Sequence, residues 1–319
     1  MTAEQARRAF DASSGEIYAS LLADAGEQGQ ARAWSLLGLA NEAAPQGWSL
    51  WGAVTGRDGG LDGDGNAGEV DSSSLGLELG MRYEGAGFAI GLAGGWIDGE
   101  ADVAARGSEV RHDGWRVGAL GRIGSGHEGF SASAAFDYAA LDGRVVRNIA
   151  FVGLNRTTAA DVSVDVLTLA GALRYGFALG GGWAAGPVVS LVHTSADLDE
   201  VDESGADALD LSSNGASEGL TRFGAGVFAG PRGPNGSLDL SVQYVGGDAN
   251  LAGVTLALDG APGAPFTVVS PRGSADGALA GISGRFELAG GWAIGGQASA
   301  LIRGDGSSIS GRAWVGIRF

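Results

Sequence analysis

The chain ends in GRAWVGIRF, residues 311–319, and this stretch decides the fold class. Every second position is hydrophobic, and the set is Ala313, Val315, Ile317 and Phe319. Arg312 and Arg318 fall on the alternate positions. Successive side chains of a β-strand point to opposite faces, so this strand has one apolar face and one face that carries arginine. A strand of this kind separates an apolar environment from a polar one.

The same alternation recurs along most of the chain. Twelve alternating segments follow one another from Trp48 onward: 48–57, 72–84, 87–98, 111–124, 128–141, 162–178, 182–195, 217–230, 236–247, 276–289, 291–303 and 308–319. Most are longer than the five or six residues that are usual for strands of globular proteins. A strand that crosses a membrane needs about 9–11 tilted residues, which these segments supply.

The connections between the segments alternate in length. The short ones are 84–87, 124–129, 178–182, 231–236 and 288–291, and the long ones are 58–71, 99–110, 142–161, 196–216 and 248–275. The link 304–307 is a brief exception. Short turns at one rim and long loops at the other are typical of a transmembrane β-barrel. We therefore predict an all-β fold, a twelve-stranded antiparallel outer-membrane barrel, closed because lipid cannot satisfy an open sheet edge.

Charged residues within the segments share one parity. In 72–84, for example, Leu77 and Leu79 oppose Glu78. An arginine that faces lipid near the bilayer midplane costs about 2–4 kcal/mol, and we expect no arginine of the twelve segments to break the parity. The polar face is thus predicted to line a lumen. Its charged members are Arg57, Glu78, Arg82, Arg116, Arg122, Asp137, Arg174, Arg222, Asp239, Arg285, Glu287, Arg303, Arg312 and Arg318.

Aromatic residues gather near the predicted strand ends. We interpret them as two girdles at the membrane interfaces, although aromatic residues also favour strand ends for other reasons. The predicted girdle residues are Tyr83, Phe88, Trp96, Trp115, Tyr138, Trp183, Tyr244, Phe286 and Trp292.

Residues 1–46 form a different region, because their apolar residues follow a ragged helical spacing. We predict a helical linker over 1–46 and a barrel over 47–319. The helix precedes the first strand, so it can thread the lumen and act as a plug. Its charged side chains are then presented to the arginine-bearing wall: Glu4, Arg7, Arg8, Asp11, Glu16 and Asp24.

Composition excludes several classes of protein. The net charge is −17, from 37 acidic residues against 20 basic residues, all of them arginine. A nucleic-acid partner is not expected, because binding to phosphates needs a positive face. The chain has no cysteine, so it has neither disulfides nor thiolate metal sites. It has no apolar stretch long enough for a transmembrane helix and no signal peptide at its start, so we expect that an upstream leader has been removed if it acts outside the cytoplasm.

No motif in the chain supports catalysis. GSGHEG, residues 124–129, matches a dinucleotide-binding pattern, but a strand follows it where a helix is required. The acidic segment 62–73 lacks the central glycine and final glutamate of a calcium loop, although weak binding of divalent ions stays open. The three histidines are scattered and suggest no catalytic set. We therefore expect no enzymatic activity, no metal centre and no cofactor.

Four stretches together resemble a known family. They are FDASSGEIYASLLADA (10–25), the run 47–96, NIAFVGLNRTTAADV (148–162) and the terminal AWVGIRF (313–319). In their order and spacing they resemble the C-terminal translocator domain of monomeric autotransporters, the type V secretion proteins of Gram-negative bacteria. The resemblance implies an outer-membrane barrel with an internal helix and extracellular long loops. It also implies that the barrel delivers an N-terminally attached passenger, which these 319 residues do not contain, to the cell surface.

The resemblance further implies a set of partners. These are outer-membrane lipid and lipopolysaccharide, the barrel assembly machinery, periplasmic chaperones and the attached passenger, with the barrel itself a monomer. Val315, Ile317 and the terminal Phe319 resemble the family's assembly signal. The alternative is a stand-alone outer-membrane channel or surface-loop adhesin with a plugging helix. The helical leader of about forty residues favours the translocator, because a channel has no need of a linker to cargo.

Overall fold

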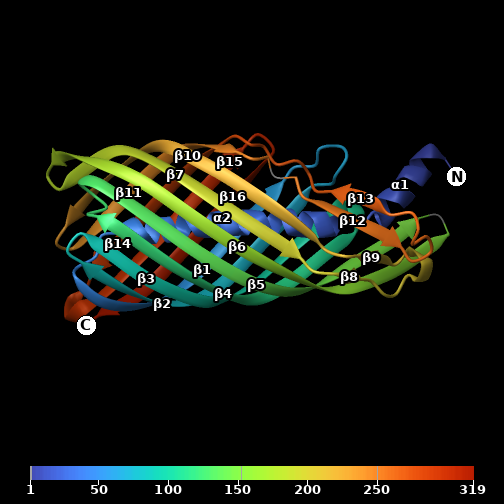
Figure 1. Ribbon diagram of the computed structural model, residues 1–319, viewed down its shortest axis with the longest axis horizontal. Coiled ribbons are helices and arrows are strands. Elements are labelled where there is room, and N and C mark those ends of the chain that lie inside the picture. The colour runs from blue at the N-terminus through green and yellow to red at the C-terminus, as the bar shows by residue number, and fades with distance from the viewer. Residues whose placement is uncertain (1, 152, 250) are drawn as a thin grey trace.

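The computed structural model describes residues 2–151, 153–249 and 251–319, and in it twelve strands form a closed antiparallel barrel around a helix (Figure 1). The barrel strands are β1 (Gly47–Leu61), β2 (Val70–Gly85), β3 (Phe88–Val103), β4 (Ser108–Gly124), β5 (Gly129–Phe151), β6 (Leu154–Gly180), β7 (Trp183–Leu198), β10 (Ala216–Gly233), β11 (Gly236–Gly247), β14 (Gly277–Glu287), β15 (Trp292–Arg303) and β16 (Gly306–Arg318). Each pairs with its neighbours in chain order, and β1 closes the wall against β16, with Leu50 opposite Ile317. The predicted fold class is confirmed.

The two rims of the barrel differ in their connections. At the rim that we call the turn end, the barrel strands are joined by 86–87, 125–128, 181–182, 234–235 and 288–291, the last containing η3 (Ala289–Gly291). At the opposite rim, the loop end, the links are 62–69, 104–107 with η1 (Ala104–Arg106), 152–153, 199–215, 248–276 and 304–305. The two longest loops contain β8 (Val201–Asp202), η2 (Asp207–Leu209), β9 (Leu211–Ser213), β12 (Gly253–Leu258) and β13 (Phe266–Val269). Their four strands form a small second sheet at the loop end.

Two of the predicted long loops are largely strand, so these parts of the prediction are wrong. Between β3 and β4 only 104–107 leave the sheet, and β5 and β6 are joined through 152–153 where a loop over 142–161 was expected. The alternation continues in these extensions, but its faces are exchanged. Leu141 and Val145 are buried inside, whereas the carboxylate of Asp142 and the guanidinium of Arg144 point outward. Outward polar residues are stable in water but not in lipid. The predicted segments were defined by outward apolar residues, so they end before these extensions.

The expected parity of the arginines also fails at one position. Arg111 of β4 shares the outward face of Trp115, and its side chain is 75 % exposed. It lies 3.9 Å from a carboxylate oxygen of Glu100 on β3. Both residues belong to the extensions beyond the apolar part of the wall, where a charge that faces outward remains in water.

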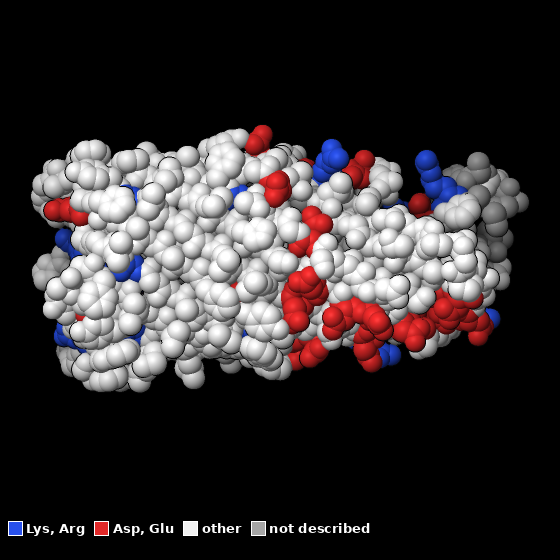
Figure 2. All heavy atoms as spheres, in the orientation of Figure 1, with Lys and Arg blue, Asp and Glu red and all other residues white. Residues whose placement is uncertain are grey.

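Figure 2 shows the same division on the outer surface. Between the turn-end rim and the middle of the molecule the surface is almost free of charge, and acidic side chains gather from the middle toward the loop end. Large apolar side chains cover the uncharged part and are mostly exposed, as with Leu77, Leu79 and Val227, at 65 %, 73 % and 61 %. This is the surface expected of a wall that meets lipid.

Two helices precede the barrel. α1 (Ala3–Ser13) projects beyond the loop end, and α2 (Glu16–Asn41) runs along the lumen to the turn end (Figure 1). α2 packs chiefly against β3–β7. The described part of the region predicted as one plug over 1–46 is therefore divided, with α2 inside the lumen and α1 beyond the loop end (Figure 1). Among the described residues, neither helix combines the length and the hydropathy needed to cross a membrane.

Apolar residues form two cores inside the barrel. The loop-end core surrounds the first half of α2, where Ile17, Tyr18 and Leu22 are fully buried against the wall and against Leu211 and Leu256 of the small sheet. The second core surrounds the later half of α2, around Trp34 and Leu37. The polar part of the lumen lies mainly between and beside these two cores.

Candidate functional site: the lumen and its helix

Ion pairs tie the middle of α2 to the wall. The carboxylate of Asp24 accepts hydrogen bonds from Arg57 of β1 at 2.8 Å and from Ser72 of β2 at 2.6 Å. Glu27, one helical turn later, accepts two bonds from Arg222 of β10, at 2.7 and 2.8 Å, and one from Arg303 of β15 at 2.5 Å. Bidentate pairs of arginine and carboxylate fix direction as well as distance. α2 is therefore held from two sides of the barrel.

In the next contact along α2, the helix supplies the positive charge and the wall supplies the negative charges. Arg32 of α2 forms ion pairs with Glu78 of β2 and, at 3.2 Å, with Asp137 of β5. The side chains of all three residues are at least 95 % buried. Removing one partner of a buried pair typically costs about 3–5 kcal/mol, because it leaves a charge without compensation. These contacts therefore favour retention of α2 in the lumen.

At the turn end, two wall arginines cap the C-terminus of α2. The last carbonyl groups of a helix have no partner within the helix, and the helix dipole makes this end negative. Arg82 donates to the carbonyl oxygens of Leu39 and Glu42, both at 2.8 Å, and Arg122 donates to that of Ala40 at 2.9 Å. Glu84 lies between the two guanidinium groups and forms ion pairs with both.

At the loop end, a buried cluster holds the start of α2. Arg147 of β5 binds both carboxylate oxygens of Glu203 at 2.6 Å, and the Tyr18 hydroxyl donates to the same carboxylate at 2.6 Å. Burial, and then the charge of Glu203, raise the pKa of Tyr18 far above its usual range. Arg106 of η1 forms ion pairs with Glu16 and Asp11, at 2.7 and 3.0 Å.

The structure gives each predicted lumen residue a position. Glu78, Arg82, Arg122, Asp137, Arg174, Arg222, Arg285 and Arg312 are buried inside, and Arg57, Arg116, Asp239, Glu287 and Arg303 are partly buried there. Arg318 is exposed at the end of β16. They do not form one cluster, since Arg174 pairs with Asp239 of the wall at 2.5 Å and Arg285 pairs with Glu287 at 2.6 Å.

The predicted plug residues are divided by the kink between the helices. Among the described side chains, Asp24 is the member of this set that meets an arginine of the predicted lumen wall, namely Arg57. Glu16 and Asp11 contact Arg106 of a loop instead, and Arg7 is exposed on α1. The side chains of Glu4 and Arg8 lie outside the described part of the structure.

Sequence reasoning missed Glu27 and Arg32 of α2, which form ion pairs with the wall, and Glu42, whose carboxylate lies 3.4 Å from Arg285. They belong to a stretch that Gly26 and Gly29 made difficult to interpret as helix. The available signal was charge. A helix inside an arginine-bearing lumen needs buried carboxylates, and Glu27 follows Asp24 at helical spacing.

The predicted girdle residues all lie on the outer face. Phe88, Trp183, Phe286 and Trp292 are exposed near the turn end, where Tyr83 packs between Trp48 and Phe88 at ring distances of 5.1 and 5.8 Å. Toward the loop end lie Trp96, Trp115, Tyr138 and Tyr244. The hydroxyls of Tyr138 and Tyr244 donate to Asp165 and Asp276, at 2.7 and 2.5 Å. Polar tips of aromatic rings thus meet the first outward carboxylates.

The acidic loop 62–69 has a structural explanation of its own. The carboxylate of Asp64 accepts hydrogen bonds from the backbone N–H groups of Ala67 and Asn66, at 2.8 and 2.9 Å, which lowers its pKa. Within the described ranges, no group of three or more histidine or carboxylate side chains is placed to hold a metal ion. Asp64 therefore orders its own turn.

Comparison with known proteins identifies this arrangement. The profile of the autotransporter β-domain family matches residues 50–299. The chain belongs to this family. Among curated protein sequences, no relative is detected.

Solved structures share the fold of this autotransporter β-domain. The translocator domain of the autotransporter NalP from Neisseria meningitidis superposes with a TM-score of 0.75 at 18 % identity, over 96 % of this chain and 100 % of that one. The transport unit of AIDA-I from Escherichia coli gives 0.59 at 13 % identity, over 85 % and 90 % of the two chains. The β-domain of the Bordetella autotransporter BrkA gives 0.55 at 14 % identity, over 86 % and 100 %. As a member of the autotransporter β-domain family, this chain is an outer-membrane transport barrel.

Proposed function

We propose that this autotransporter β-domain delivers a passenger, attached ahead of α1, to the cell surface, with the loop end extracellular. The path of the N-terminal segment carries the proposal. α2 occupies the lumen from the turn end to the loop end, and α1 leaves the barrel at the loop end (Figure 1). Any segment attached upstream of α1 therefore continues from that rim.

The contacts along this path support a translocator over a channel. α2 is fixed by Arg57 and Arg222 in the middle of the lumen and by Arg82 and Arg122 at its C-terminus. A stand-alone channel would gain nothing from a helix held so firmly in its pore. A translocator needs a tether that leaves the passenger at the surface and closes the pore afterwards.

The experiment uses three epitope tags in cells that express the chain behind a signal peptide. One tag precedes residue 1, one lies in the loop 248–276, and one lies in the turn 234–235. Protease added to intact cells should remove the first two tags and spare the third, which becomes accessible after the outer membrane is permeabilised. Cleavage of the loop tag alone would contradict passenger delivery, and cleavage of the turn tag alone would reverse the proposed orientation.

A further inference from the structure

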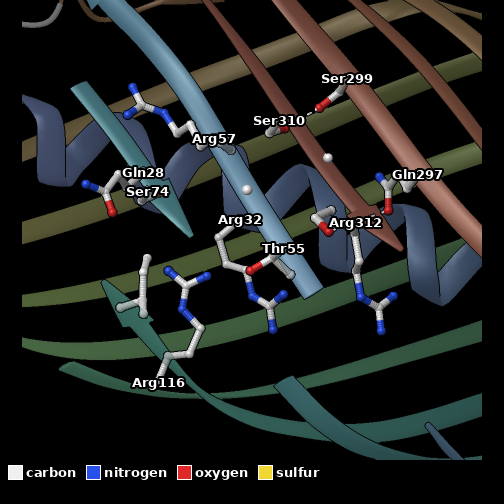
Figure 3. Close-up of a pocket in the computed structure, with 15 residues that line it drawn as sticks. Gln28, Arg32, Thr55, Arg57, Ser74, Arg116, Gln297, Ser299, Ser310 and Arg312 are labelled. Atoms are coloured by element: carbon white, nitrogen blue, oxygen red, sulfur yellow. Dashed lines mark hydrogen bonds between the residues drawn. The ribbon is translucent and has the colours of Figure 1, made fainter. Parts of the chain in front are cut away.

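A cavity of about 50 Å³ lies between α2 and the strands β1–β4, β15 and β16 (Figure 3). α2 packs chiefly against β3–β7 and less closely against β1, β2, β15 and β16. The volume exceeds the roughly 10–15 Å³ that one water needs. The cavity thus has room for a few waters or for one small ion.

The charged side chains that line this cavity are all arginines: Arg32, Arg57, Arg116 and Arg312. In the view of Figure 3, the guanidinium groups of Arg32, Arg116 and Arg312 lie in one row, and Arg57 stands apart. The other polar lining groups are hydroxyls and amides such as Ser310 and Gln297, which can also donate hydrogen bonds. No described carboxylate takes part in the lining.

Several of these donors lack an acceptor. Arg312 is 94 % buried, yet its Nε and Nη2 atoms form no hydrogen bond with any described residue. The nearest carboxylate oxygen in its ion pair, on Glu78, is 3.6 Å away. Its guanidinium stacks on Trp51 at 4.0 Å, which leaves the edge with its N–H groups free. Arg116 has a buried Nε atom without an acceptor as well.

The ion pairs around the cavity leave one of its arginines without a partner among the described residues. Asp24 pairs with Arg57, Asp137 pairs with Arg32, and Glu78 pairs with both Arg32 and Arg312. The ion pairs of these guanidinium groups within 4.0 Å thus involve three carboxylates, and among the described residues Arg116 is near Asp137 without an ion pair to it. A buried charge without compensation is costly, and guanidinium groups do not release their proton under ordinary conditions.

We propose that this cavity binds one small inorganic anion, such as chloride, between Arg116, Arg312 and the helix residue Arg32. The anion supplies a negative charge and accepts hydrogen bonds from the free N–H groups. Because Arg32 belongs to α2, the site is complete only while the helix occupies the lumen. A ligand that binds one state stabilises that state, so the anion favours the plugged barrel. This inference does not depend on passenger delivery.

The test measures thermal unfolding of the refolded full chain in detergent, at constant ionic strength, while gluconate is replaced by chloride or bromide. The wild type should gain stability with halide until the site saturates. In Arg116→Gln, which removes the guanidinium group that has no ion pair, this gain should disappear. The matched control is Arg174→Gln, which lies outside the cavity beside Asp239 and should keep the halide response at lower overall stability.

The outcomes separate an anion from water. Equal halide responses of the wild type and Arg116→Gln, or no response in either, would overturn the proposal and leave the cavity to water. A second readout comes from crystals soaked in bromide, where an anomalous peak beside Arg116 and Arg312 is expected. A wild-type crystal without such a peak counts against the site even if the halide stabilises the protein.

Discussion

At the scale of single residues, a charged side chain that is buried in the lumen is stable only when it is paired with a partner. Glu203 shows this most clearly, because the Arg147 guanidinium and the Tyr18 hydroxyl both donate to its buried carboxylate. Deleting the whole carboxylate leaves Arg147 buried without compensation, whereas deleting only the hydroxyl leaves the ion pair intact.

We expect Glu203→Ala to lower the free energy of unfolding by about 3–5 kcal/mol and Tyr18→Phe by about 1.5–3 kcal/mol. The Tyr18 contribution also has a pH dependence. The folded pKa is raised, so the contribution is present below the unfolded pKa of about 10 and is lost as pH rises beyond it. Denaturant unfolding at pH 8 and pH 11 measures this, and an equal difference between wild type and Tyr18→Phe at both values would contradict it.

The terminal residue gives a second prediction at this scale. Phe319 is 72 % exposed, and its backbone N–H donates to the Trp48 carbonyl at 3.1 Å. If the side chain is an assembly signal, both deletion of Phe319 and Phe319→Ala should reduce insertion into the outer membrane. Conductance per inserted barrel should not change. Normal insertion of Phe319→Ala beside poor insertion of the deletion would assign the effect to the lost backbone bond instead.

At the scale of elements, the kink between α1 and α2 decides where the chain leaves the barrel. Gly15 makes it with a φ of +70°, a conformation that other residues adopt with strain. A Cβ at this position would lie 2.4 Å from a methyl group of Leu211 and 2.8 Å from one of Leu256. The small sheet therefore packs directly on the kink.

We expect Gly15→Ala to destabilise the loop-end core by about 1–3 kcal/mol, from backbone strain alone. Gly26→Ala is the matched control, because its Cβ would meet only a Leu220 methyl group at 3.9 Å. A glycine inside a helix is about 1 kcal/mol worse than alanine, so the control should gain stability. Limited proteolysis at 10–25 reports both effects, and equal protection of the two variants would exclude a special role for the kink.

At the scale of the whole molecule, the barrel and α2 close one pore together. Deleting residues 1–40 should raise single-channel conductance in planar bilayers, because it opens a lumen whose arginines are then hydrated. The full chain provides the reference trace. Equal conductance of the two proteins would mean that α2 does not obstruct ions.

The sequence predicted the membrane-facing half of this molecule well. Leu77 and Glu78 could be assigned to opposite faces because lipid imposes one rule on the outer surface of the wall. Leu141 and Asp142 follow the same alternation with the faces exchanged, and periodicity alone does not say which face is wet. Charge and helical spacing mark Glu27 as a lumen carboxylate, but its partner Arg222 lies 195 positions away, and a single sequence does not say which arginine tertiary packing selects.

The exchange of polarity along the wall also determines how deeply the barrel sits in its membrane. On the turn-end side of Tyr138 and Tyr244 the outer face is apolar. On their loop-end side Asp142, Arg144 and Asp161 point outward. In a thicker bilayer, immersing more of the wall would bring these charges into hydrocarbon, at up to about 2–4 kcal/mol for an arginine. Thinning the surrounding lipid costs only a fraction of a kcal/mol per ångström of mismatch. We therefore expect the membrane to adjust to the protein, so that a zone of altered thickness surrounds each barrel.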